Sequence, residues 1–543
     1  MTEKSLIKGA AVLAAAGIIV KVIGAVFRIV VAGIITDTGM AYYSPAYNLY
    51  AVLLVVSTSG IPIAISRMVS ERYAIGRYDE ADRVFHISRY LMIGLGLAGA
   101  LVLFIIAKPF AAAIDLEGSA MAMQAMAPAL LLVPIMSSYR GYFQGQQLMG
   151  PTALSQVVEQ IFRVGFGILL ALLLMQGTFM ASVYTDPLQR GAAGVCFGAS
   201  TGAAGGLAVM LIIYLRSRSR IRRQVAESKG EGREPAGAIL KAMLAIAVPI
   251  TIGATLMPLV NLVDATVVNR RLLESGFDAA TAKALYGQLT GFCEPIIALP
   301  QVLMSAIVIS IVPMVAAANK LKDTEKLHET ISLGLRMATI LAFPCAAGLL
   351  ILAKPALMMI FFTQKEAAAN AAPSLQVLGL SFILLALITI MTGILQGVGR
   401  QVYPVINLFL GLLVKVVVTW TLVALPAVNV VGAPLGTMAA YIVAMTLDLI
   451  CVLRFTGARF RFSQLVVKPM ISSAVMGVVV FATYKGAFML LGSNTLATLL
   501  AIAVGVIVYG VMIIKTRTIL REEMLEIAAG RKLVAVADRL KLW

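Results

Sequence analysis

Long apolar segments recur along the whole chain, and they constrain its fold more than any other feature. Each is long enough for a membrane-spanning helix, which needs about 20 mainly apolar residues. We identify fourteen, near 10–35, 43–67, 88–108, 122–143, 152–176, 190–215, 238–266, 285–316, 328–353, 372–398, 402–425, 430–453, 468–490 and 494–515. Only 13% of the 543 residues are charged, about half the share in a soluble domain. We therefore expect an all-α polytopic membrane protein, not a soluble enzyme or a secreted disulfide scaffold.

The distribution of basic residues predicts how these helices are oriented. The chain has 44 Lys and Arg against 26 Asp and Glu, a net charge of +18. With the N-terminus inside, 31 of the 44 basic residues lie in inside segments, 8 in outside segments and 5 within spans. Such an excess is typical of cytoplasmic loops. We expect a multi-pass protein of the bacterial cytoplasmic membrane with both termini in the cytoplasm, and no nucleic-acid partner.

The longest polar interruption divides the predicted helices into two sets of six. This segment, 216–237, is strongly basic and predicts a cytoplasmic linker. The other predicted parts are an N-terminal lobe at 1–215, a C-terminal lobe at 238–453, two further helices within 468–515 and an amphipathic cytoplasmic tail at 516–543.

Short matches between the two sets support a duplication. The segment GYFQG at 141–145 recurs as GILQG at 393–397, and the same offset of 252 residues carries Arg163 onto Lys415. Paired halves are typical of alternating-access transporters, which bind substrate at the interface of the repeats.

Four glycines at intervals of four residues lie in the sixth predicted span: Gly194, Gly198, Gly202 and Gly206. Such a row lets another helix approach closely. The same stretch matches the GxSxG pattern of hydrolases, but that pattern requires a strand before the serine. We therefore expect a helix contact here and no catalytic serine.

Cations inside the predicted spans are candidates for a substrate site: Lys21, Arg28, Arg163 and Lys415. A charged side chain at a helix centre costs about 2.5–3.5 kcal/mol and usually faces a bundle interior or a water-filled cavity. Lys21 and Arg28 are seven residues apart, so they lie on one helix face. Four such donors around one cavity would suit phosphate or pyrophosphate. Snorkelling to the interface and internal pairing would also account for these charges.

Three acids inside the spans are further candidates. Glu159 precedes Arg163 by four residues, which predicts a pair along the helix, either structural or part of a substrate site. Glu294, before a proline, and Asp264 are candidates for binding a coupling cation or proton, unless they only cap helix ends. The two histidines and four cysteines have no metal-type spacing, so we expect no metal site and no cofactor.

Two stretches carry a family resemblance: GIPIAISRMVSE at 60–71, and YRGYFQG at 139–145 followed by PTALSQVVEQ at 151–160. They resemble the polysaccharide-transporter branch of the MOP flippase superfamily, most closely its stage V sporulation protein B and YtgP group, relatives of the MurJ-type lipid II flippases. The resemblance covers essentially the whole chain. It implies fourteen helices in two lobes around a central cationic cavity, and export of an undecaprenyl-pyrophosphate-linked sugar such as lipid II.

The resemblance also implies roles for single residues. Lys21 and Arg28 match the first-helix cations implicated in binding the diphosphate. Glu294 matches an acid of the eighth helix, although Pro295 stands where an arginine is usual. The second-helix arginines typical of Gram-negative members are missing from 45–60, which is apolar. We hypothesise that Arg163 and Lys415 supply that charge.

These observations predict a flippase and not an enzyme. We expect it to be a monomer whose partners are the bilayer and an undecaprenyl-linked glycolipid, with the polyprenyl tail beside the two C-terminal helices. Membrane potential, H⁺ or Na⁺ could drive the cycle. Teichoic-acid, capsular and spore polysaccharide precursors are cargoes that the sequence leaves open.

Two different functions are compatible with a polytopic membrane protein but fit this sequence less well. A MATE-like cation or drug antiporter would need an acidic cavity, whereas the predicted cavity is basic. An integral membrane glycosyltransferase or polymerase would need catalytic carboxylates, and the short outer loops contain no cluster of them.

Overall fold

The protein is mostly helical in the part that the computed structural model describes, residues 3–177, 185–228, 234–458, 460–519 and 538. Thirteen helical segments of these residues are long and apolar enough to cross a membrane. No strand occurs in these ranges. The expected all-α polytopic class is therefore confirmed.

The first of the thirteen segments contains two of the predicted spans. Helix α1 (Glu3–Thr58) is interrupted at Thr36, where φ is 62° and ψ is −179°. This backbone conformation is unfavourable for a residue with a side chain, and it separates α1 into two helices. Helix α2 (Gly60–Ala74) continues directly from the second of them. The break accounts for the difference between thirteen segments and fourteen expected spans.

Most of the remaining helices follow the predicted spans, and the six-residue helix Lys365–Asn370 lies between two of them. The remaining helices are α3 (Tyr78–Ala113), α4 (Ser119–Gly145), α5 (Met149–Gln176), α6 (Pro187–Ala226), α7 (Ala236–Glu274), α8 (Ala279–Gln288), α9 (Glu294–Lys320), α10 (Thr324–Ile360), α11 (Lys365–Asn370), α12 (Ala372–Gly397), α13 (Val402–Val423), α14 (Gly432–Thr456), α15 (Lys468–Leu491) and α16 (Asn494–Lys515). A π-helical turn, Leu289–Cys293, joins α8 to α9. Pro295 follows it and has no N–H to donate, which fits the change in hydrogen-bond pattern.

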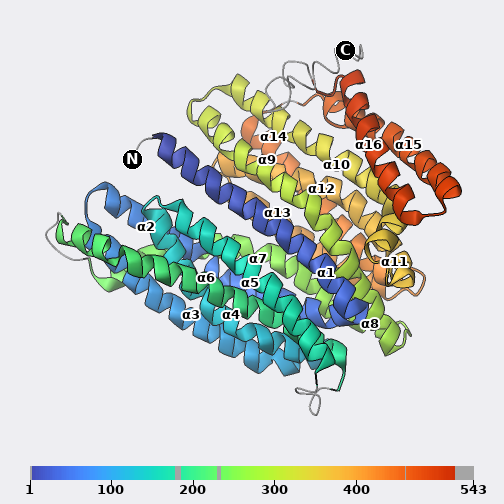
Figure 1. Ribbon diagram of the computed structural model, residues 1–543. Helices are drawn as coiled ribbons and strands as arrows, with labels where there is room; N and C mark the ends of the chain where they lie inside the picture. The colour runs from blue at the N-terminus through green and yellow to red at the C-terminus, as the bar shows by residue number, and fades with distance from the viewer. Residues whose placement is uncertain (1–2, 178–184, 229–233, 459, 520–537, 539–543) are drawn as a thin grey trace. The chain divides into compact units, whose positions relative to one another are not determined.

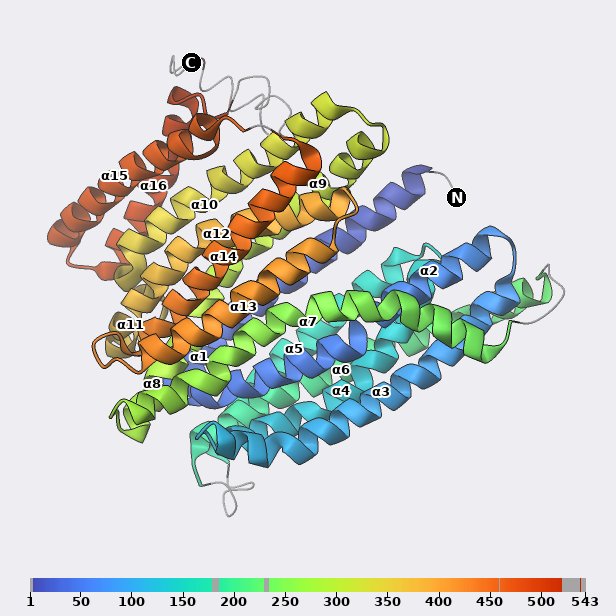
Figure 2. The same cartoon turned by 180° about the vertical axis from the view of Figure 1, so that it is seen from behind.

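The chain forms two compact units, Met1–Gly291 and Phe292–Trp543. In the first, α3, α4, α5 and α6 are neighbours and α7 packs against α1 and α2 (Figure 1). In the second, α13 packs on α14 and α10 on α12, and the α15–α16 hairpin lies against α10 (Figure 2). These two units are defined by how the helices pack. The predicted lobes at 1–215 and 238–453 were defined by sequence matches between two halves of the chain, and they remain a prediction.

Two predicted segments lie partly outside the described residues. Of the basic linker at 216–237, the first part is helical because α6 continues to Ala226, and residues 229–233 are not described. Of the amphipathic tail at 516–543, only 516–519 and residue 538 are described.

The glycine row of α6 makes the expected close contact, and its partner is α5. A Cβ atom at Gly198 would lie 2.6 Å from the Cα of Gly167 and 2.7 Å from the carbonyl oxygen of Arg163. A Cβ atom at Gly202 would lie 2.7 Å from the carbonyl oxygen of Glu159. Since these neighbours are backbone atoms, they cannot yield by a rotamer change. The two helices touch because α6 has no side chains there.

A Gly198→Leu variant should therefore fold poorly. Overpacking of a tight contact costs about 1–3 kcal/mol or more, and here the obstacle is backbone. We expect a clear loss of folded, monodisperse protein in detergent and a lower thermal-unfolding midpoint. Gly165→Leu is the matched control on α5, because a Cβ atom there meets nothing within 4 Å. Equal behaviour of the two variants would contradict the contact.

Candidate functional site

Two of the four predicted cations lie over the same aromatic ring in the first unit. The Cζ atom of Arg28, on α1, is 5.7 Å from the ring centroid of Tyr47. The Cζ atom of Arg163, on α5, is 5.4 Å from that centroid. Arg28 also donates through Nη2 to the carbonyl oxygen of Thr290 at 3.4 Å. Because the face of an aromatic ring attracts cations, one side chain keeps two like charges together.

Tyr47 belongs to a column of tyrosines on the second half of α1. The rings of Tyr43 and Tyr47 stack with centroids 5.8 Å apart and an interplanar angle of 16°. Those of Tyr47 and Tyr50 are 6.3 Å apart and tilted. Tyr43 is 2% exposed, and its buried hydroxyl has no hydrogen-bond partner among the described residues. We call Arg28, Tyr43, Tyr47 and Arg163 the arginine–tyrosine site.

These tyrosines were not predicted from the sequence. Their spacing, i, i+4 and i+7, places all three on one helix face, and this was the available signal. Arg28 and Arg163 both approach the column, Arg28 from the same helix before the break at Thr36. The site can offer two guanidinium groups and one phenolic hydroxyl, which are all donors to an anion.

The predicted pair of Glu159 with Arg163 is wrong. Glu159 accepts from Nη2 of Arg140, on α4, at 2.8 Å. Nε of Arg140 donates to Oγ of Ser155 at 2.8 Å, so Arg140 reaches α5 through two contacts. The guanidinium of Arg163 is directed instead to the ring of Tyr47. Within the described part of the chain, no carboxylate forms an ion pair with Arg163.

The other two predicted cations differ in exposure. Lys21 is exposed on the first half of α1, two turns before Arg28. Lys415, in the second unit, is only 1% exposed on α13, which packs on α14. Their roles in substrate binding stay predictions.

The predicted acids of the coupling-ion hypothesis lie in different units. Asp264, on α7, is 8% exposed, one turn after Asn261, whose carbonyl oxygen accepts from Nδ2 of Asn48 at 3.4 Å. Glu294 is partly buried in the first turn of α9, where an acid is favoured by the helix dipole. A further buried acid, Asp448 on α14, was not predicted. It is 1% exposed and accepts from Nδ2 of Asn407 at 2.7 Å.

An apolar cavity lies in the second unit between α9, α10, α15 and α16. Its volume is about 710 Å³, within the range of about 300–1,000 Å³ for small-molecule sites. Its wall is aliphatic apart from a few residues, among them Tyr509, whose hydroxyl donates to the carbonyl oxygen of Ile340 at 2.6 Å. Two glycines, Gly348 and Gly505, also line it. The cavity can therefore hold a hydrocarbon chain but offers little to a polar head group.

Comparison with known proteins assigns the family. The model of the family described as polysaccharide biosynthesis protein matches residues 6–319, more than half of the chain. The chain belongs to this family. A second model, MatE, matches residues 249–421. The resemblance to the polysaccharide-transporter branch of the MOP superfamily is confirmed.

Curated relatives of this family member come from Bacillus subtilis (strain 168). YabM, an uncharacterized membrane protein, is 30% identical over 97% of this chain and 95% of its own length. Lipid II flippase MurJ is 27% identical over 88% of each chain. Stage V sporulation protein B is 23% identical over 98% of this chain and all of its own length.

Two solved structures share the fold of the chain. Lipid II flippase MurJ in an inward closed conformation has a TM-score of 0.65 at 14% identity, over 92% of this chain and 97% of its own. An inward-facing multidrug resistance MATE transporter of the MOP superfamily has a TM-score of 0.63 at 13% identity, over 81% and 96%. At these identities the likeness concerns the fold alone.

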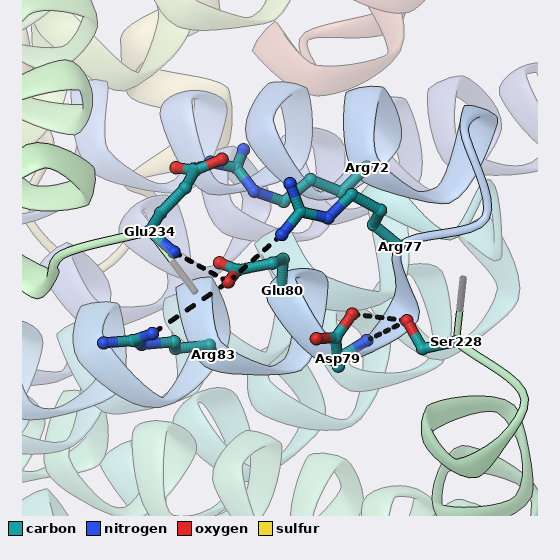
Figure 3. Close-up of polar contacts among 7 residues, drawn as sticks. All are labelled: Arg72, Arg77, Asp79, Glu80, Arg83, Ser228 and Glu234. Atoms are coloured by element: carbon teal, nitrogen blue, oxygen red, sulfur yellow. Dashed lines mark hydrogen bonds and ion pairs between the residues drawn. The ribbon is translucent and has the colours of Figure 1, made fainter. Parts of the chain in front are cut away.

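A polar clasp ties the segment between α6 and α7 to the corner between α2 and α3 (Figure 3). Glu80, only 1% exposed, accepts from the backbone N–H of Glu234 at 2.9 Å. Nη2 of Arg72 lies 2.5 Å from a carboxylate oxygen of Glu234. Asp79 and Ser228 are hydrogen-bonded to each other. The clasp is completed by two arginines beside Glu80, Arg77 at 3.5 Å and Arg83 at 3.9 Å.

Replacing Glu80 should release the segment between α6 and α7 from the corner between α2 and α3. In a Glu80→Ala variant the N–H of Glu234 loses its acceptor, and a lost hydrogen bond to a charged group costs about 1.5–3 kcal/mol. We expect trypsin to cleave after Lys229 or Arg233 several times faster than in the wild type. Glu71→Ala is the control, because Glu71 pairs with Arg67 on the exposed surface. An unchanged cleavage rate in Glu80→Ala would contradict the clasp.

Proposed function

We propose that this protein is a flippase that exports an undecaprenyl-pyrophosphate-linked oligosaccharide across the bacterial cytoplasmic membrane by alternating access, with lipid II as the cargo. The arginine–tyrosine site is the observation that carries the proposal. It gathers two permanent positive charges and an unpartnered hydroxyl, among the described residues, inside a membrane-spanning unit. Such donors suit the diphosphate of the head group. A relative named as lipid II flippase and the family assignment support it.

The apolar cavity of the second unit supports a lipid-linked substrate. It lies beside α15 and α16, the two helices expected to accompany the polyprenyl tail. An aliphatic wall stabilises such a tail by the hydrophobic effect and needs no specific polar contact. We propose that the tail is held there during export.

The remaining roles belong to the same proposal. Both termini face the cytoplasm and the protein acts as a monomer, without cofactor or covalent chemistry. Lys21 and Lys415 add positive charge for the head group. Movement of one charge across the membrane potential is worth about 2.3 kcal/mol per 100 mV, so the potential, H⁺ or Na⁺ resets the cycle, with Glu294 and Asp264 as candidate ion sites.

A second candidate, a MATE-like exporter of organic cations, shares the fold. The site found here is basic, and Arg163 has no ion-paired carboxylate among the described residues. Cationic substrates would be repelled at this ring, so we favour an anionic cargo.

Complementation tests the proposal. The protein is expressed in cells depleted of their own lipid II flippase, and an external enzyme that cleaves lipid II reports how much reaches the outer leaflet. We expect cleavage product to return. If the protein reaches the membrane without product, lipid II is not the cargo, and the same assay with teichoic-acid, capsular and spore precursors decides the class. Export of none of these would overturn the flippase proposal.

A further inference from the structure

Tyr47 contacts both cations of the arginine–tyrosine site, although the two come from different helices. Arg28 lies on the first half of α1, before the break at Thr36, whereas Tyr47 lies after it. Arg163 comes from α5. The two Cζ atoms lie at 5.7 Å and 5.4 Å from one ring centroid. Each guanidinium is thus positioned by the same aromatic side chain.

We propose that Tyr47 is a positioning residue, which holds Arg28 and Arg163 as a pair and so makes the site select a diphosphate over a monophosphate. The inference rests on the proposed function, because it assigns selectivity to the same head-group site. In this inference Tyr47 carries no charge and does not itself bind the phosphate.

The surroundings of Tyr47 fix its ring. Tyr43 stacks on it at 5.8 Å and Tyr50 packs at 6.3 Å, and both neighbours are buried at 2% and 4% exposure. A ring held by its neighbours presents a defined face. Two flexible arginine side chains that contact such a face lose less freedom when a ligand binds, because they are already ordered.

The backbone of Arg163 is held in place independently of its guanidinium group. A Cβ atom at Gly202 of α6 would lie 2.9 Å from the Cβ of Arg163, and one at Gly198 would lie 2.7 Å from its carbonyl oxygen. The stem of Arg163 is therefore held by α6 and its guanidinium by Tyr47. Because the site lacks a carboxylate paired with Arg163 in the described part of the chain, the ring restrains this cation without neutralising it.

A paired site suits a diphosphate for a geometric reason. Each guanidinium binds phosphate oxygens through two parallel hydrogen bonds. The two phosphoryl groups of a diphosphate can therefore each bind one guanidinium. A monophosphate has a single phosphoryl group, so one of the two guanidiniums is left without a phosphoryl partner. The hydroxyl of Tyr43, buried and without a partner among the described residues, is a third donor at the same place.

The test measures binding of undecaprenyl pyrophosphate and undecaprenyl monophosphate to the purified full-length protein in detergent. Two variants are compared, Tyr47→Phe, which keeps the ring, and Tyr47→Leu, which removes it. We expect Tyr47→Phe to retain the wild-type preference for the diphosphate, and Tyr47→Leu to lose roughly tenfold of it. The control is Tyr90→Leu, which removes a ring contacted by Arg89 at 5.4 Å on α3, outside the site.

The outcomes separate the two proposals. Loss of preference in Tyr47→Leu, with Tyr47→Phe and Tyr90→Leu like the wild type, supports the positioning role. If the wild type prefers the diphosphate and Tyr47→Leu keeps that preference, the positioning role is overturned and the proposed function stands. If the wild type shows no preference, the selectivity proposal falls, and the export assay still decides the proposed function. A general loss of folding in Tyr47→Leu would lower binding of both lipids equally, so the ratio remains informative.

Discussion

Replacing Arg28 and Arg163 together by Gln should abolish export while the protein still reaches the membrane. Each arginine forms charge-assisted hydrogen bonds to phosphate in our proposal, and such a bond is worth about 1.5–3 kcal/mol. The loss of both predicts a reduction of at least about 100-fold in transport at limiting substrate. The measurement is the amount of lipid II cleaved outside flippase-depleted cells, normalised to protein in the membrane.

The control for this double variant is Arg270→Gln. Arg270 pairs with Glu274 on the exposed end of α7, so its loss also removes a positive charge but not from the site. We expect it to transport like the wild type. Preserved transport in the Arg28 and Arg163 double variant would refute the head-group site, whatever the cargo. Pairing Arg163→Gln with Lys415→Gln instead tests whether Lys415, buried in this structure, contributes to transport.

Filling the apolar cavity should stop transport without unfolding the protein. Gly348 lines the cavity, and a Cβ atom there meets nothing within 4 Å. The Cβ atom of a Gly348→Trp variant therefore meets no neighbour, and we expect its ring to occupy space in the cavity that the polyprenyl tail requires. We expect a loss of transport of at least roughly tenfold with an unchanged thermal-unfolding midpoint.

Gly510→Trp is the matched control, because Gly510 of α16 also has open space at its Cβ position and does not line the cavity. Normal transport is expected from it. If Gly348→Trp also transports normally, the tail is not held in this cavity. If both variants fail to transport, the added volume of a tryptophan on these helices causes the loss of transport, and not the filling of the cavity.

Most of the fold could be predicted because membrane-spanning helices are recognisable by length and hydropathy. The sequence also separates the two spans within α1, near 10–35 and 43–67, and the break at Thr36 lies between them. The residue at the break could not be predicted, because Thr36 adopts a positive φ, a conformation in which glycine or asparagine is expected.

The site could be predicted only in part, because sequence shows neighbours along a helix and not across helices. Arg28 and Arg163 were found since a charge within an apolar span is conspicuous. Tyr47 was missed because an aromatic residue in such a span looks like ordinary packing. The partner of Glu159 was predicted wrongly for the same reason, since Arg140 reaches it from another helix. The cavity depends on packing volumes that no residue pattern specifies.

The close contact of α5 with α6 has a consequence for interpreting variants of this chain. In our proposal α6 contributes no group to the substrate, yet its glycines determine where the stem of Arg163 stands. A change at Gly198 or Gly202 should therefore do two things at once: it destabilises the contact of α5 with α6, and it displaces Arg163. In any variant of these glycines that still folds, we expect altered cargo selectivity although no ligand-binding residue has changed.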